Sequence, residues 1–297
     1  MWRIYQSLIK NNDKILGIIL IIPVIIWILT ILIYPFVNII QLSFTNLKLF
    51  GTDANFVGFR TYQRLFQDET FLISIKNSLI FTLVSVFLQI VLGLLTAVLL
   101  NENFFGCKFL RTWVITPWVI PYSVVAVIGR WMLSSTFGVI NWMLIKTGLI
   151  SEPIAFLGTI NLAMPTVIAI NTWKWFPFVS IIYLAAMQGI PEDLYEAARI
   201  DGSSGLQEFR YITLPSLIPT MVITTLLMTF WNFNTFGLVW LLTYGGPGTA
   251  TTTMPISVYI KAFREYRGAE ASALSVIMLI ILLLYTIIYR KLQPSED

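Results

Sequence analysis

The sequence predicts an all-α polytopic membrane protein with six transmembrane helices. Hydrophobic residues make up 57% of the 297 residues and charged residues only 11%, whereas soluble domains carry about 25% charged residues. So few charges cannot cover a water-facing surface. Long uncharged stretches recur along the chain, and a spanning helix needs about 20 mostly apolar residues. Helices are expected because backbone polar groups in lipid must bond within their own segment.

Six apolar stretches are long enough to cross a membrane at about 1.5 Å per residue. Pro23 and Pro35 are expected to bend the first stretch. Lys174 separates two half-length apolar pieces, so we place it inside one helix. The glycines and proline at 245–248 end the fifth stretch with a turn. The predicted spans are residues 15–40, 78–100, 112–134, 161–185, 214–242 and 269–290, within a single transmembrane domain of residues 15–290.

Three segments are expected outside the membrane on one side: residues 1–14, 186–213 and 291–297. The first apolar run is far longer than the core of about 7–15 residues in a cleavable signal peptide, so we expect it to stay as a span. Lys and Arg are divided almost evenly between the two sides. The positive-inside rule therefore barely prefers an orientation with the N-terminus inside.

Several function classes lack the residues that they need. The chain has no His, which removes the commonest general base and metal ligand. No glycine is followed by Lys, so the phosphate-binding loop of ATPases is absent. The apolar spans hold no acidic pair, which argues against a protease or a proton relay. We expect no catalytic residue, no metal site and no cofactor in this chain, and its scattered basic residues indicate no nucleic-acid partner.

The densest charge cluster lies between the fourth and fifth spans. Pro191 is expected to open a helix with Leu194, Ala197 and Ala198 on one apolar face. Gly202 lies in a turn before a second short helix, and Pro215 is expected to start the next span. Such a segment could lie on the lipid surface. Its acidic residues outnumber its basic ones, which suits a protein partner better (Glu192, Asp193, Glu196, Asp201 and Glu208 against Arg199 and Arg210).

Two motifs carry a resemblance to a known family. The sequence E-A-A-R-I-D-G begins at Glu196 and is followed by I-T-L-P, which ends at Pro215, while L-L-T-Y-G-G-P occupies residues 241–247. Together they resemble the first permease subunit of maltose-type carbohydrate importers of the ATP-binding-cassette (ABC) class. The resemblance implies the type I ABC importer permease fold and a cytoplasmic EAA coupling loop. The implied coupling residues are Leu194, Glu196, Ala197, Ala198, Asp201 and Gly202.

The resemblance also implies partners and a location. The partners are a second homologous permease subunit, two ATPase subunits that hold the ATP and Mg, an extracytoplasmic solute-binding protein, membrane lipid and a carbohydrate. The outer loops at 41–77 and 243–268 are expected to dock the binding protein. Both termini would lie on the cytoplasmic side of a bacterial or archaeal inner membrane. ATP hydrolysis would belong to the partner, and this chain would not be an enzyme.

Three intramembrane clusters combine aromatic residues with Asn, Thr or Pro, as a sugar site requires. Asn is costly in lipid, so Asn171, Asn232 and Asn234 are expected to face the bundle interior. The clusters match the three helix regions that contact substrate in maltose-type permeases. Carried over by motif, the implied contacts are Trp118, Tyr122, Asn171, Lys174, Trp175, Phe178, Met228, Trp231, Asn232 and Thr235.

Lys174 and Trp175 depart from the pattern of the family's maltose carriers, which have small or apolar residues there. A buried charge must be wetted or paired, and two interpretations stay open: Lys174 contacts cavity water or a partner subunit, or it faces an anionic group of the substrate. Trp173 and Trp175 are expected to project to different faces of the helix. The identity of the substrate stays open, and the alternative function is a stand-alone secondary carrier or channel for a small polar solute.

Overall fold

The computed structural model describes residues 20–48, 54–102 and 104–291. Residues 1–14, the first five residues of the first predicted span and residues 292–297 of the predicted tail lie outside the described part. Within it the chain is helical, and one isolated bridge joins Thr45 to Phe56. The chain divides into two compact units, residues 1–67 with 258–280 and residues 68–257 with 281–297. The sequence predicted one domain.

The first unit joins the N-terminal helix to a segment from much later in the chain. A helix over Leu20–Ser43 contains the π-helical stretch η1 (Ile28–Ile33) and α2 (Tyr34–Ser43). It is followed by α3 (Arg60–Gln67), and later by η3 (Ile260–Arg264) and the first part of α14 (Gly268–Lys291). The amide of Ala269 donates to the carbonyl of Leu47 at 3.0 Å. This bond helps to explain why residues 258–280 group with the N-terminal helices.

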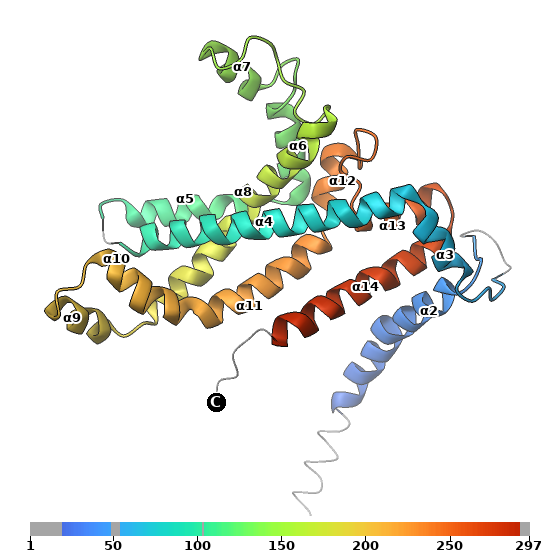
Figure 1. The fold of residues 1–297 in the computed structure, drawn as a ribbon, viewed down its shortest axis with the longest axis horizontal. Helices are drawn as coiled ribbons and strands as arrows, with labels where there is room; N and C mark the ends of the chain where they lie inside the picture. The colour runs from blue at the N-terminus through green and yellow to red at the C-terminus, as the bar shows by residue number, and fades with distance from the viewer. Residues whose placement is uncertain (1–19, 49–53, 103, 292–297) are drawn as a thin grey trace, which may run out of the picture. The chain divides into compact units, whose positions relative to one another are not determined.

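The second unit is built on the long helix α4 (Glu69–Asn101), which packs along α8 (Ile160–Gln188) and against α11 (Leu214–Phe233). Figure 1 shows α5 (Cys107–Val119) beside α4, and α5 also packs against α8. Gly93 lets α4 and α8 approach closely, because a Cβ there would lie 2.6 Å from a methyl carbon of Val179. Small residues commonly permit such close helix pairs in membranes.

The third predicted span is not one straight helix. Instead of a single helix over 112–134, α5 and α6 (Tyr122–Met132) meet at a bend of 96°. Ile120 at the break has extended backbone angles (φ −65°, ψ 131°). The reason is that Pro121 follows it, and a residue before proline is driven away from the helical region.

The fifth predicted span begins earlier and ends earlier than expected. One helix runs from Gly205 to Phe233 through α10 (Gly205–Glu208), the π-helical stretch η2 (Phe209–Thr213) and α11. Pro215 lies in the first turn of α11, where its missing N–H costs little, but the apolar helix as a whole already begins at Gly205. Residues 237–243 form the separate helix α12 (Gly237–Thr243).

The remaining helices are short: α7 (Val139–Lys146), α9 (Glu192–Ile200) and α13 (Met254–Tyr259). In the described residues, five helices are long and apolar enough to cross a membrane, and the bent α5–α6 pair makes a sixth if it counts as one span. Each predicted span overlaps one of these helices or the bent pair, with the differences in boundaries given above. Lys174 lies inside α8, as predicted.

Candidate functional site

Five aromatic side chains from three separate parts of the chain form one cluster, which we call the aromatic floor. Its members lie on α5, α6, α8 and α11, and their adjacent ring centroids are 5.1–6.3 Å apart, a range typical of aromatic pairs. All five were predicted from sequence, and the structure brings them together. They are Trp118, Tyr122, Trp175, Phe178 and Trp231.

The aromatic floor is held in place from within and open on part of its surface. The indole N–H of Trp175 donates to the hydroxyl of Tyr122 at 2.8 Å, which links α8 to α6. Trp118 and Trp231 are 37% and 41% exposed, respectively, while the other three rings are half-buried. An open aromatic face of this kind suits the C–H face of a sugar ring.

Three buried amides lie beneath this floor and join the three central helices. Asn232 of α11 donates to Gln89 of α4 at 2.9 Å and accepts from both Gln89 and Asn171 of α8. All three side chains are buried. Gln89 was missed from sequence, although a lone Gln in an apolar span is itself a signal of an interior position. Such a triad specifies one arrangement of the helices, because an unpaired amide in the core is costly.

The prediction that Asn residues face the interior holds for two of three positions. Asn171 and Asn232 are buried, whereas Asn234 is exposed and donates only to the carbonyl of Phe230 in its own helix. The reason is that the helix ends at Phe233, so Asn234 turns away from the packed face. Two further predicted contacts, Met228 and Thr235, are buried; the Thr235 hydroxyl donates to the carbonyl of Trp231. In this conformation they lie within the packed interior of the subunit.

Lys174 has partners that neither sequence interpretation contained. Its side chain is 4% exposed, and its ammonium group donates to the backbone carbonyls of Trp118 at 3.1 Å and Ile120 at 2.6 Å. The same group lies 4.8 Å from the ring centroid of Tyr122, a cation–π distance. In the described residues the charge of Lys174 is directed at the end of α5. A contact with cavity water, a partner subunit or an anionic substrate stays a prediction.

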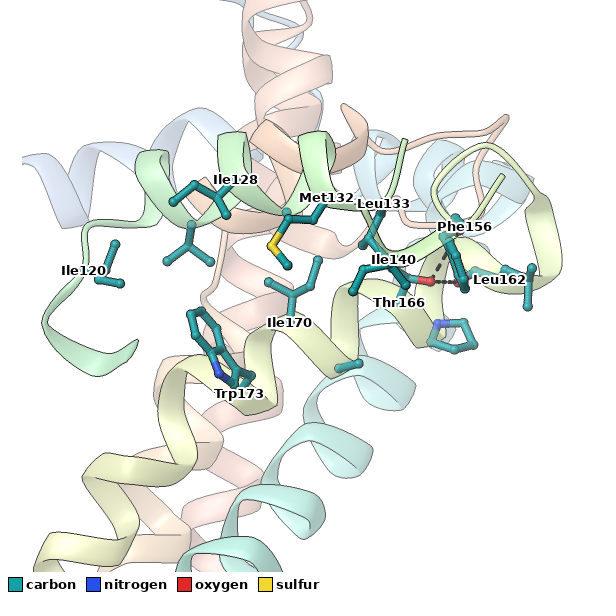
Figure 2. Close-up of a pocket in the computed structure, with 14 residues that line it drawn as sticks. Ile120, Ile128, Met132, Leu133, Ile140, Phe156, Leu162, Thr166, Ile170 and Trp173 are labelled. Carbon is teal, nitrogen blue, oxygen red and sulfur yellow. Dashed lines mark hydrogen bonds between the residues drawn. The ribbon is translucent and has the colours of Figure 1, made fainter. Parts of the chain in front are cut away.

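An apolar pocket of about 650 Å³ lies on a different face of α8 from the aromatic floor. It is lined by α6, α7, α8 and the loop between α7 and α8 that contains Phe156 (Figure 2). Trp173 lines it, while Trp175 belongs to the aromatic floor, so the two rings project to different faces as predicted. The hydroxyl of Thr166 already donates to the backbone carbonyls of Leu162 at 2.7 Å and of Phe156 at 3.4 Å. The lining of this pocket therefore offers few polar partners to a hydroxyl-rich solute.

The segment between α8 and α11 is shaped by local capping motifs. Pro191 precedes α9 as its N-cap, and acidic residues occupy the first turn, where they complement the helix dipole. At the other end of α9 the backbone amide of Gly202 donates to the carbonyl of Arg199, and the amide of Ser203 donates to the carbonyl of Ala198. This pair of bonds is that of a Schellman cap. Gly202 has φ +83° with open space around it. Glycine is favoured here by backbone conformation and not by crowding.

Two side-chain contacts fix α9 against the helix that follows it. The guanidinium of Arg199 lies 3.2 Å from the carboxylate of Glu208, and the hydroxyls of Tyr195 and Thr213 lie 2.9 Å apart. The hydrogen bond and charge of Glu208 raise the pKa of Arg199 further above its ordinary value. Arg199 therefore stays charged at every physiological pH.

Most of the predicted coupling residues are on the surface of this segment. Leu194 is 50% exposed, and Ile200 and Leu206 are 86% and 76% exposed. Ala198 is half-buried, and the other predicted residues are exposed (Glu196, Ala197, Asp201 and Gly202). Large aliphatic side chains on a short polar helix form a surface that fits a partner. We call residues 192–213 with these exposed side chains the coupling segment.

Comparison with known proteins agrees with this arrangement. The family model described as binding-protein-dependent transport system inner membrane component matches residues 89–296, which include the coupling segment and all five rings of the aromatic floor. The chain belongs to this family. It therefore has a type I ABC importer permease fold and is an inner-membrane transport subunit.

Three relatives illustrate the similarity. The trehalose/maltose transport system permease protein MalF of Thermococcus litoralis is 35% identical over 96% of both chains. A crystal structure of a bacterial ABC transporter involved in import of the acidic polysaccharide alginate is 29% identical with a TM-score of 0.83, and the match covers 98% of this chain and 100% of that one. A second alginate transporter structure, in complex with an alginate pentasaccharide-bound periplasmic protein, is 28% identical with a TM-score of 0.83 over 94% and 93% of the two chains.

Proposed function

We propose that this chain forms one half of the translocation pathway of an ATP-driven, binding-protein-dependent carbohydrate importer. A second homologous permease subunit supplies the other half, and two ATPase subunits drive the cycle. The observation that carries the proposal is the coupling segment, whose aliphatic side chains are exposed although they lie on an ordered, capped helix. Both termini then lie on the cytoplasmic side, together with this segment.

In this mechanism the chain contributes no catalytic group. ATP and Mg are bound by the ATPase subunits, whose closure moves the coupling segment. The ion pair between Arg199 and Glu208 and the continuous helix from Gly205 to Phe233 connect that movement to α11. The helix ends beside Trp231 of the aromatic floor, so movement of the coupling segment can reach the substrate path through one rigid element.

The chemistry of the aromatic floor favours a neutral sugar face in this half of the pathway. Its surface consists of aromatic rings, and the nearby charge of Lys174 already binds two carbonyl oxygens. An anionic group at the floor would have to compete with those bonds. Similarity to a trehalose/maltose permease supports a neutral carbohydrate, whereas similarity to the alginate importer supports an acidic one.

The test is reconstitution of the assembled transporter in proteoliposomes with its ATPase and binding protein. The proposal predicts ATP-dependent uptake of trehalose or maltose and binding-protein-stimulated ATP hydrolysis. Uptake of alginate pentasaccharide with no uptake of the disaccharides would contradict the neutral assignment alone. If the chain by itself moved a polar solute with no ATPase present, the alternative of a stand-alone carrier or channel would replace the proposal.

A further inference from the structure

The break between α5 and α6 leaves polar backbone groups inside an apolar span. A helix end loses the N–H partners of its last carbonyls, and in lipid there is little water to replace them. The carbonyls of Trp118 and Ile120 are at this break. Both are bound by a single group, the ammonium of Lys174, from the neighbouring helix α8.

The position of this charge is electrostatically suitable. The C-terminal end of a helix carries about half a negative charge from the aligned peptide dipoles, and α5 ends at Val119. The ring of Tyr122, the first residue of α6, faces the same ammonium at 4.8 Å, and that of Trp175 at 5.9 Å. Lys174 thus contacts the last turn of one half-helix, one of the two residues between the halves and the first residue of the other.

We propose that Lys174 is a positioning residue that holds the 96° break of the third span and so places Trp118 and Tyr122 in the aromatic floor. Pro121 accounts for the extended backbone of Ile120 but offers no donor to the carbonyls. Lys174 supplies both the donors and the charge. The two residues therefore act together, Pro121 by disfavouring a continuous helix and Lys174 by stabilising the bent alternative. Its importance for transport rests on the proposed function of the floor.

The experiment measures the bend directly in the assembled transporter. Spin labels at Phe109 and Trp131, both exposed on their helices, are placed in a Cys107→Ser background. With eleven residues on each side of Ile120 and the observed bend, the labelled Cα atoms should be about 22 Å apart, against about 33 Å in a straight helix. Distances are read by double electron–electron resonance.

Lys174→Met keeps the length of the side chain but removes its donors and charge. We expect the main distance to move from about 22 Å toward about 33 Å or to spread between them, most of all when Pro121→Ala is combined with it. Pro121→Ala alone should keep the short distance, because Lys174 still binds the carbonyls. Lys174→Arg should keep it as well, since a guanidinium retains charge and several donors. Lys146→Met, which removes an exposed lysine on α7 that lies over Trp142, is the matched control.

An unchanged distance in Lys174→Met, or a straightened span in Pro121→Ala with Lys174 intact, would overturn the inference. If Lys174→Met does not assemble, Lys174→Leu takes its place, because it also lacks donors and charge, and the same two criteria apply. Binding-protein-stimulated ATP hydrolysis is measured in parallel. A lengthened distance with full stimulation would leave the positioning role in place and contradict the proposed role of the aromatic floor.

Discussion

The coupling segment and the aromatic floor are organised in opposite ways. The coupling segment is held by contacts between residues close in sequence, such as the Schellman cap at Gly202 and the pair of Arg199 with Glu208 nine positions later. The floor joins rings from distant parts of the chain, and the amide triad beside it joins Gln89 to Asn232, 143 positions apart. The coupling segment leaves aliphatic side chains exposed, whereas the triad buries polar ones. The contact that we propose with an ATPase can thus be encoded locally, whereas the proposed substrate path depends on how whole helices pack.

This contrast predicts that the stability of the complex depends more on the polar groups of the amide triad beside the floor than on those of the coupling segment. Asn232→Leu would leave the amides of Gln89 and Asn171 without their shared partner, at about 1–3 kcal/mol for each unpaired group. We expect the largest fall in the thermal unfolding midpoint of the purified complex from this variant. Asn234→Leu, two residues away but exposed, is the control and should change the midpoint little. Equal midpoints for the two variants would show that the triad does not hold the helices.

The coupling segment should be sensitive to backbone conformation instead. Gly202→Val forces a β-branched residue into the left-handed region, at about 1–2 kcal/mol or more. We expect insertion to be normal and binding-protein-stimulated ATP hydrolysis to fall about tenfold, the factor that corresponds to 1.4 kcal/mol. Gly205→Ala is the matched control, because Gly205 has free space for a Cβ and no positive φ. Full stimulation in Gly202→Val would remove this turn from the coupling mechanism.

A smaller effect is expected from the aromatic rings themselves. Trp231→Ala removes two ring contacts of the floor, with Trp175 and with Phe178. At about 0.5–1.5 kcal/mol for an aromatic contact, the apparent KM for the transported sugar should rise about two- to tenfold. Trp231→Phe should recover most of the loss. Trp113→Ala, an exposed ring of α5 outside the floor, should leave the KM unchanged, and a rise there equal to that of Trp231→Ala would contradict a specific role of the floor.

The smallest effect is expected at the ion pair of the coupling segment. Arg199→Gln removes an ion pair in which the Arg199 side chain is 61% exposed and the Glu208 side chain 13% exposed, and a pair with one partner in water contributes little. The pKa of Arg199 is raised in the folded protein. The stabilisation that comes from its charge is therefore fully present below the ordinary pKa, and it is lost only as the pH rises through the higher pKa of the folded state. Stimulated ATP hydrolysis measured between pH 6 and 9 should therefore show no step due to Arg199. A step that disappears in Arg199→Gln would contradict this.

The sequence predicted the coupling segment almost completely, because its determinants lie within one or two helical turns. The glycine after the Glu196 helix and the acidic first turn both have local physical causes. The six spans were also predictable from the distances between charges. The exception in detail was η2, where a π turn before Pro215 lets one helix run from the coupling segment into the membrane.

The floor was predictable in composition but not in arrangement. Its five rings follow from motifs, yet the partners of Lys174 lie 56 and 54 residues away in sequence, beyond any local pattern. The break of the third span had a visible signal in Pro121, but a proline alone does not tell a kink from a 96° bend. What decides the geometry is the lysine on another helix, and that pairing exists only after the helices have packed.

If the coupling segment is the part of this chain that an ATPase subunit holds, the two should lie in contact in native membranes. A photo-crosslinking amino acid placed at Ile200, the most exposed of the large aliphatic positions of the segment, tests this contact. We expect an adduct with the ATPase subunit, identified by mass spectrometry, whose yield changes when ATP is bound. Adducts with lipid only, or labelling of this position by a membrane-impermeant reagent added from outside the cell, would contradict it.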